Sequence, residues 1–173
     1  MLYECFMNLG HKSGLLSTIK YSINGTDTAS THTTPNSIRI NELLAEMVDA
    51  GCEYAFMEVS SHALHQKRTA GLEFDGAVFT NITHDHLDYH TDFKDYLYTK
   101  KRLFDGLTLN AFALVNKDDK NGLVMMQNTK ATKYTYSLKS VSDFKTKVIE
   151  SDFNGMLLDI NVFTNSVLTC LTL

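Results

Sequence analysis

The sequence has no tryptophan, a single proline and only three cysteines. Cys5, Cys52 and Cys170 form neither a close pair nor the spacing of a metal site, and such an odd, scattered set is typical of reduced thiols in the cytoplasm. No apolar run approaches the roughly 20 residues that span a bilayer, and the first residues lack the layout of a signal peptide. These absences predict a cytoplasmic chain that does not contact a membrane.

Neither sign of charge is in large excess, because 16 basic residues face 20 acidic ones and the formal net charge is −4. Without a basic stripe to neutralise phosphates, non-specific nucleic-acid binding is not expected. What the sequence does have is a hydrophobic fraction of 43% in 173 residues. That length and composition suit one globular domain with a core of its own.

Segments of helical and strand period alternate along the chain. Helices are predicted over 2–9, 38–48 and 93–104 and near 123–127, with Leu2, Cys5, Phe6 and Leu9 on one face of the first. Strands are predicted over 15–19, 54–59, 76–82, 111–116, 133–137, 144–150 and 155–163, and a polar loop over 21–36. The alternation predicts an α/β fold, with a mostly parallel sheet flanked by helices and an antiparallel C-terminal extension.

Three of the strands are nearly continuous apolar runs, 54–59, 76–82 and 111–116, as is typical of central strands covered on both faces. Polar clusters follow the first two runs, and ligands bind at the carboxyl ends of the strands in an open parallel sheet. The first cluster is Glu58 to His62 and the second is Thr83 to His90, so five of the seven histidines lie between 62 and 90. We therefore expect the ionisable chemistry there.

Glu58 is a lone carboxylate in its apolar run, and burying it unpaired would cost several kcal/mol. A metal ion would remove that cost. His84 and His86 suit zinc, whereas the carboxylates suit magnesium, and the spacing alone does not choose. Asn116, Asp118 and Asp119 follow a third strand and are interpreted either as ligand contacts or as a turn.

Lys100 gives a further indication of chemistry. A rotation of about 100° per residue puts it in the middle of the apolar stripe formed by Phe93, Leu97 and Phe104, whereas Lys101 points further away. Lys100 either extends to water or lies inward, where desolvation would lower the pKa of its amine. A neutral amine can react with carbon dioxide to give a carbamate that behaves as a carboxylate ligand.

These clusters, in this order, resemble the Mur ligase family, and within it the branch that adds the third amino acid to a UDP-N-acetylmuramoyl dipeptide. The matching segments are Thr31-His32-Thr33-Thr34-Pro35, Met57-Glu58-Val59-Ser60-Ser61-His62, Gln66-Lys67-Arg68, Thr80 to His90, Lys100, and Val115-Asn116-Lys117-Asp118-Asp119. The resemblance covers residues 2 to 160 and belongs to the central ATP-binding domain of the family.

The resemblance implies a set of functional residues. Glu58, His86 and a carbamylated Lys100 resemble Mg²⁺ ligands with catalytic roles. Residues that resemble the binding site of the UDP-sugar dipeptide are Thr33, Thr34, Ser60, Gln66 and Arg68, and Asn116 resembles a residue close to the adenine of ATP. His32 stands where other members often carry Asn and is not included. The implied partners are ATP, the UDP-N-acetylmuramoyl dipeptide and an amino acid, diaminopimelate or lysine, bound by a monomer.

The resemblance also implies missing parts. Residues 1–160 are interpreted as a partial central domain without its glycine-rich phosphate-binding loop, and 161–173 as a divergent tail, so the chain is expected to be inactive alone. Three alternatives remain open: a non-catalytic fragment that binds the UDP-sugar peptide, another Mur or folylpolyglutamate-type ligase, and a zinc hydrolase built on the His/Asp cluster.

Overall fold

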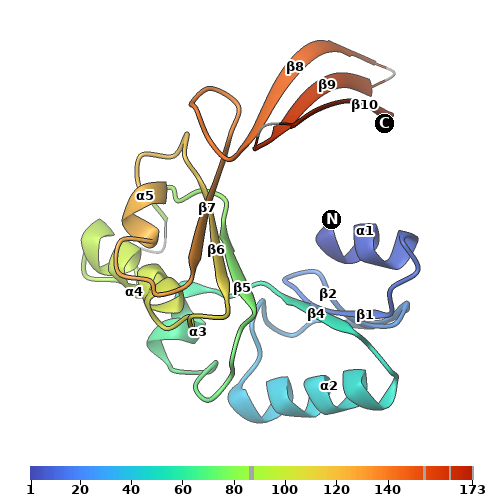
Figure 1. Cartoon of the computed structure of the whole chain (residues 1–173). Coiled ribbons are helices and arrows are strands. Elements are labelled where there is room, and N and C mark those ends of the chain that lie inside the picture. The colour runs from blue at the N-terminus through green and yellow to red at the C-terminus, as the bar shows by residue number, and fades with distance from the viewer. Residues whose placement is uncertain (86–87, 154, 164, 173) are drawn as a thin grey trace. The chain divides into compact units, whose positions relative to one another are not determined.

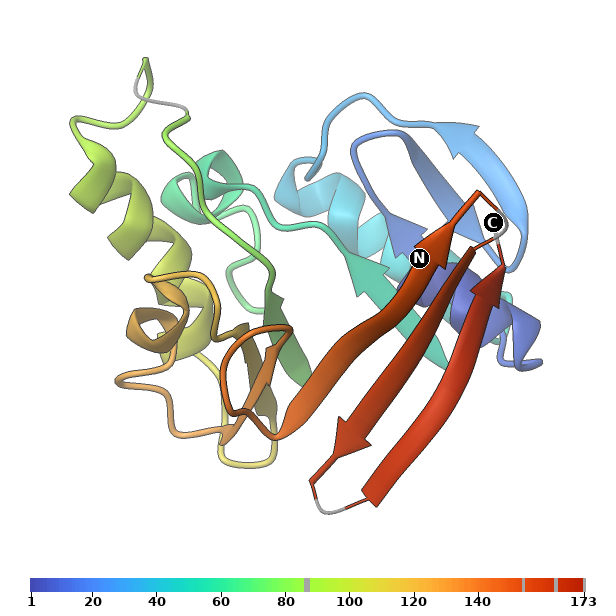
Figure 2. The ribbon, with the colours of Figure 1, turned by 90° about the horizontal axis from the view of Figure 1, so that it is seen from above.

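Two β-sheets organise the chain, and each belongs to a unit with its own core (Figures 1 and 2). The computed structural model describes residues 1–85, 88–153, 155–163 and 165–172. The first unit comprises Met1–Leu72 and the second Glu73–Leu173. In the described part of the chain, no helix is both long and apolar enough to cross a membrane.

The first unit is built on a four-stranded sheet in the order β3-β2-β1-β4. Its strands are β1 (Ser13–Leu16), β2 (Lys20–Ile23), β3 (Thr26–Ala29) and β4 (Tyr54–Met57), and its helices are α1 (Leu2–Asn8), α2 (Ser37–Asp49) and α3 (Ser61–His65). β1 runs parallel to β4 and antiparallel to β2. Helices α1 and α2 cover opposite faces of this sheet (Figure 1).

Helix α2 packs its apolar face on this sheet as the helical period predicts. Ile40, Leu43 and Met47 are buried with Leu16 and Tyr21 in the core of the unit. The helix begins where Asn36 accepts a hydrogen bond from the Arg39 backbone N–H through its side chain, because an N-cap satisfies a donor that the first turn leaves free.

The prediction of a loop over 21–36 is wrong for its first half, where β2 and β3 form a hairpin. Asn24 and Gly25 connect the two strands with φ angles of 46° and 89°. An Asn-Gly pair favours a two-residue hairpin turn because both residues tolerate positive φ. The strong polarity of the segment hid this turn, although the dipeptide indicates it.

The apolar residues that share one face of α1 are not the ones that this helix buries. Tyr3 is the buried residue of this helix, Phe6 is half-buried, and Leu2 and Leu9 are 52% and 74% exposed. The Tyr3 hydroxyl lies 2.6 Å from that of Ser22 and accepts from the Gly25 backbone N–H at 3.0 Å. The hydrogen bonds of Tyr3 to the β2–β3 hairpin therefore determine which face of α1 is buried, and an apolar pattern cannot predict such bonds.

The second unit is built on a six-stranded sheet in the order β10-β9-β8-β7-β6-β5. Its strands are β5 (Gly76–Phe79), β6 (Phe112–Asn116), β7 (Thr132–Ser137), β8 (Phe144–Asp152), β9 (Gly155–Val162) and β10 (Asn165–Thr172), and its helices are α4 (Phe93–Asp105) and α5 (Gly122–Met125). β5 to β8 are parallel, and β8 to β10 are antiparallel. The predicted α/β class with a mostly parallel sheet and an antiparallel C-terminal extension is confirmed.

The apolar runs 54–59 and 76–82 do not form central strands in these sheets. β4 and β5 each lie at one end of the strand order, and Tyr54 and Val78 are 41% and 42% exposed. A continuous apolar run indicates that water is disfavoured on both faces of a strand, but it does not identify a hydrogen-bonding neighbour. The strand assignments are therefore correct. The predicted central position is wrong for these two runs and right for the run 111–116, which forms β6 between β5 and β7.

Candidate functional site

Glu58 follows the last residue of β4 and lies at the carboxyl end of that strand, as predicted. Its carboxylate is exposed rather than buried, so the predicted burial cost is wrong. Carboxylate oxygen Oε2 accepts two hydrogen bonds from Thr18, one from the backbone N–H at 2.9 Å and one from the hydroxyl at 2.8 Å. Among the described residues, no donor contacts the other oxygen, Oε1.

The pair Thr33 and Thr34 comes from the loop that precedes α2. Thr34 is 1% exposed, and its hydroxyl donates to the Glu58 carbonyl oxygen at 2.8 Å and accepts from the Ser60 backbone N–H at 3.0 Å. Ser60 in turn caps α3, because its hydroxyl accepts from the Ala63 N–H at 3.2 Å. Thr34 and Ser60 therefore connect the loop to the end of β4, whereas the Thr33 hydroxyl lies 3.0 Å from that of Thr18.

Arg68 and Gln66 lie just beyond α3, where Lys67 adopts a positive φ of 55°. This left-handed residue ends the helix in the way that a glycine more often does. The guanidinium of Arg68 donates to the Gln66 side-chain oxygen from Nε at 2.9 Å and from Nη2 at 2.6 Å. Its third contact runs from Nη1 to the Thr34 carbonyl oxygen at 2.7 Å.

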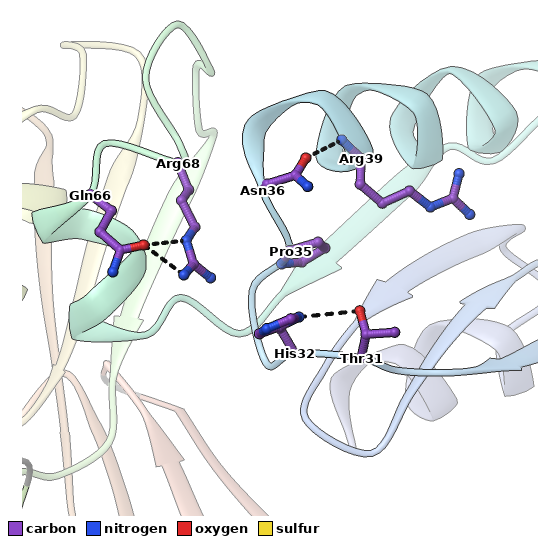
Figure 3. A pocket seen from close by; sticks show the side chains of 7 residues that line it. All are labelled: Thr31, His32, Pro35, Asn36, Arg39, Gln66 and Arg68. Carbon is purple, nitrogen blue, oxygen red and sulfur yellow. Dashed lines mark hydrogen bonds between the residues drawn. The ribbon is translucent and has the colours of Figure 1, made fainter.

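These side chains border a pocket of about 310 Å³, whose lining residues are Thr31, His32, Pro35, Asn36, Arg39, Gln66 and Arg68. Figure 3 shows Gln66 and Arg68 on one side and His32 and Pro35 on the other. Arg39 is drawn away from the pocket by ion pairs with Glu42 at 3.1 Å and Glu46 at 2.8 Å. The cation that faces the pocket is thus Arg68.

His32 lines this pocket, although it is not among the predicted site residues. The Tyr21 hydroxyl holds the backbone of His32 by donating to its carbonyl oxygen at 2.8 Å. The imidazole contacts the Thr31 hydroxyl at 3.3 Å. Its position next to the Thr33-Thr34 pair is the signal that could have identified it.

In the second unit, α4 carries Lys100 on a partly buried face, which is the inward one of the two placements that the sequence leaves open. The Lys100 ammonium lies 5.3 Å from the centre of the Tyr96 ring. Burial lowers the pKa of Lys100, and the nearby Asp85 carboxylate raises it by a smaller amount. The expectation that Lys101 points away is wrong, because Lys101 is 1% exposed and pairs with Asp105 one turn later. That carboxylate compensates the buried charge, which a hydrophobic period does not reveal.

Asn116 and the two aspartates after β6 form an interconnected turn. The Asn116 amide donates to the Thr80 carbonyl oxygen at 2.9 Å, and its side-chain oxygen accepts from the Asp118 N–H at 2.9 Å. Asp119 accepts from the Ile82 N–H at 3.0 Å. Of the two interpretations that the sequence left open, the turn is present, and it connects the ends of β5 and β6.

The histidine cluster is only partly visible in this structure. His84 stacks on Phe93 with ring centres 4.5 Å apart, and buried His90 contacts Asp95 at 3.2 Å. His86 lies outside the described residues. Within the described ranges, no group of three or more His, Cys, Asp or Glu side chains is arranged to hold a metal ion.

Comparison with known proteins identifies the class. A family model described as the Mur ligase middle domain matches residues 1–170, and the chain therefore belongs to the Mur ligase family. It is 56% identical over 161 residues to the UDP-N-acetylmuramoyl-L-alanyl-D-glutamate–2,6-diaminopimelate ligase of Parabacteroides distasonis, covering 93% of this chain and 33% of that protein. The ligase of the same name from Phocaeicola vulgatus is 58% identical with the same coverage.

Solved structures agree on the fold. A UDP-N-acetylmuramoyl-L-alanyl-D-glutamate–2,6-diaminopimelate ligase superimposes with a TM-score of 0.87 at 24% identity, over 97% of this chain and 35% of that chain. The MurF ligase of Thermotoga maritima in complex with ADP gives a TM-score of 0.66 at 15% identity, over 99% of this chain and 36% of the other. The chain thus spans about a third of the length of the relatives it matches.

Proposed function

We propose that this chain supplies part of the active site of a MurE-type ligase, which joins a third amino acid to UDP-N-acetylmuramoyl-L-alanyl-D-glutamate in peptidoglycan synthesis. The observation that carries the proposal is the bonded set of Arg68, Gln66 and Thr34 beside a pocket of about 310 Å³. The names of the relatives favour diaminopimelate over lysine as the amino acid. The ligase would act as a cytoplasmic monomer.

The substrate side of this site follows from hydrogen-bonding chemistry. The planar fork of an arginine matches a carboxylate or phosphate of the UDP-sugar dipeptide. Gln66 accepts from two nitrogens of Arg68 and thereby fixes the plane of the guanidinium. Thr33, Thr34 and Ser60 belong to the same unit. Thr34 and Ser60 bond the loop to the end of β4, and Thr33, whose hydroxyl lies 3.0 Å from that of Thr18, would contact the substrate.

The metal side would be formed by Glu58, His86 and Lys100. Glu58 fits magnesium because it is a hard oxygen ligand with one oxygen that no described donor contacts. Lys100 fits only as a carbamate, and its lowered pKa favours the neutral amine that this modification requires. Bound magnesium would neutralise charge on the transferring phosphoryl group.

The reaction would proceed through an acyl phosphate. The γ-phosphoryl of ATP passes to the D-glutamate γ-carboxylate, ADP leaves, and the amine of the incoming amino acid then displaces phosphate to form the amide. Asn116 would lie close to the adenine, and its bonds to Thr80 and Asp118 hold its amide in one orientation.

We further propose that the 173 residues bind substrate but do not catalyse the reaction alone. The proposed organisation is part of a Mur ligase central domain over 1–160 and a divergent tail over 161–173. The support is that the relatives are about three times as long as the matched segment.

Calorimetry with the purified chain tests this function. UDP-N-acetylmuramoyl-L-alanyl-D-glutamate is expected to bind in the presence of Mg²⁺, whereas UDP-N-acetylglucosamine, which lacks the dipeptide, is expected to bind far more weakly. A coupled assay with ATP and diaminopimelate should show no turnover. Equal affinity for the two ligands would contradict the substrate assignment, and turnover would contradict the proposed inactivity.

A further inference from the structure

Thr18 holds Glu58 from the neighbouring strand. β1 and β4 are parallel, with Leu16 opposite Met57, and the Glu58 backbone N–H donates to the Leu16 carbonyl oxygen at 2.9 Å. Two residues beyond β1, Thr18 therefore reaches the Glu58 carboxylate with both its N–H and its hydroxyl, at 2.9 Å and 2.8 Å. Both contacts are to Oε2, so the two bonds orient the carboxylate and leave Oε1 for another partner.

The same hydroxyl also contacts Thr33, on the substrate side. The two threonine oxygens are 3.0 Å apart. A hydroxyl has a single proton, and a charged carboxylate is the stronger acceptor. The Thr18 hydroxyl is in donor geometry to both the Glu58 carboxylate and the Thr33 hydroxyl oxygen, so the two side chains share its single proton and a change at one alters the hydrogen bond to the other.

The backbone of Thr18 is itself anchored. The Ser30 hydroxyl, just after β3, donates to the Thr18 carbonyl oxygen. Thr18 is therefore fixed between the loop that carries Thr33 and the end of β1, although its side chain is exposed. A flexible glutamate would otherwise lose rotamer freedom on binding a metal ion, and a residue that orders it beforehand reduces that cost.

We propose that Thr18 is a positioning residue that ties the orientation of Glu58 to that of Thr33, so that magnesium at Glu58 and the UDP-sugar dipeptide at Thr33 strengthen each other's binding. The roles of the two ligands rest on the proposed function, whereas the coupling of the three side chains does not. Thr18 touches neither reacting group and acts only through its two neighbours.

The coupling is measured first in the protein without ligands. The γ-methyl resonance of Thr33 is recorded by NMR in the wild type and in Glu58→Gln, each with Thr18 intact or replaced by Val, which removes the hydroxyl at nearly constant volume. We expect Glu58→Gln to shift the Thr33 resonance when Thr18 is present and to leave it unchanged in the Thr18→Val background. A shift of equal size in both backgrounds would overturn the proposal.

Calorimetry then measures the functional consequence. Thr18→Val should weaken binding of UDP-N-acetylmuramoyl-L-alanyl-D-glutamate about threefold to tenfold, the effect of one lost hydrogen bond, and should reduce its enhancement by Mg²⁺. Thr18→Ser keeps the hydroxyl, so its affinity for the dipeptide and the enhancement of that affinity by Mg²⁺ should equal those of the wild type. Thr26→Val, an exposed change on β3 of the same sheet, is the control and should alter neither.

The outcomes separate the two proposals. If the wild type does not bind the dipeptide but the NMR coupling is present, the proposed function fails and the coupling through Thr18 is supported. If the wild type binds and Thr18→Val binds equally well with the same Mg²⁺ enhancement, the proposed role of Thr18 is wrong while the function stands. An unfolded Thr18→Val would show as loss of NMR dispersion, and Thr18→Ala with Thr18→Ser then provides the same comparison.

Discussion

The guanidinium of Arg68 donates to the carbonyl oxygen of Thr34 at 2.7 Å, across 34 positions of sequence. This bond joins the segment after α3 to the loop before α2 and places the cation next to the pocket. The other nitrogens of Arg68 are directed to Gln66. Arg68 is thus held by three contacts, which only a forked side chain can make simultaneously.

Arg68→Lys is expected to weaken binding of the UDP-sugar dipeptide about tenfold or more while leaving the chain folded. A lysine keeps the charge, but its single nitrogen cannot reach both the Gln66 side-chain oxygen and the Thr34 carbonyl oxygen as the guanidinium does. Calorimetry gives the affinity, and circular dichroism confirms the fold. Arg102→Lys, an exposed change on α4, is the matched control and should bind like the wild type. An unchanged affinity for Arg68→Lys would exclude the proposed role of the fork.

Most helices and strands are predictable from the sequence because their apolar periods are regular. α4 begins at Phe93 as expected, and β6 and β7 agree within a residue or two. The grouping of Arg68, Gln66 and Thr34 follows from the family resemblance, and no spacing along the chain reveals it. The helical period placed Lys100 within the apolar stripe of α4 but did not decide whether its amine extends to water or lies inward.

The rest depends on polar contacts that leave no periodic signal. Tyr3 defines the face of α1 through hydrogen bonds to the hairpin, and Lys101 is buried because Asp105 compensates it. Ligands bind at the carboxyl ends of parallel strands, and this rule could have identified Thr18 as it identified Glu58, because Thr18 also follows a parallel strand. A single threonine, however, carries no pattern that separates it from a surface residue.

Asp118 should make the stability of the second unit depend on acid pH. Partial removal from water acts to raise the pKa of Asp118, but the backbone N–H groups of Leu138, Lys139 and Ser140 and the Ser140 hydroxyl outweigh this and lower the pKa from 3.8 to about 2. A carboxyl group with a depressed folded-state pKa stabilises the protein above its ordinary pKa. That contribution is lost as the pH falls from about 4 to about 2.

Asp118→Asn should therefore lower the free energy of unfolding at neutral pH and have a progressively smaller effect as the pH approaches about 2. Urea denaturation of both proteins across this range measures the difference. Asp75→Asn is the control, because the Asp75 side chain is exposed and makes no hydrogen bond within the described residues. A difference between wild type and Asp118→Asn that stays constant with pH would contradict the assignment.

Gly122 allows α5 to begin directly against the turn that carries Asn116. A Cβ atom at Gly122 would lie 2.0 Å from the Asn116 carbonyl oxygen, so the backbone would have to move. We expect Gly122→Ala to lower the free energy of unfolding by about 1–3 kcal/mol and to shift the NMR resonances of the Asn116 amide group. Leu123→Ala, at the next and half-exposed residue, should cost less than about 1 kcal/mol. Equal stability of Gly122→Ala and the wild type would show that the turn is not tightly packed.

Lys100 should be the lysine of α4 that reacts with carbon dioxide. Burial lowers the pKa of Lys100, with the Asp85 carboxylate acting in the opposite direction, so a larger fraction of its amine is neutral at a given pH than for an exposed lysine. The neutral nitrogen attacks the carbon of carbon dioxide, one C–O π bond breaks, and the nitrogen releases a proton to give the carbamate. Because both the neutral amine and the proton release depend on pH, the carbamate should increase with pH and with bicarbonate.

Labelled bicarbonate and ¹³C NMR test this chemistry without turnover. We expect a carbamate resonance in the wild type that grows on addition of Mg²⁺ and disappears in Lys100→Arg. Lys94→Arg is the matched control, because Lys94 is exposed on the same helix and also lies over a tyrosine, with its ammonium 5.9 Å from the centre of the Tyr98 ring. A resonance that persists in Lys100→Arg would assign the carbamate to another amine. If the wild type gives no resonance at high bicarbonate and alkaline pH, the lowered pKa of Lys100 is insufficient for carbamylation in this chain, and Glu58 would then lack its proposed partner at the metal.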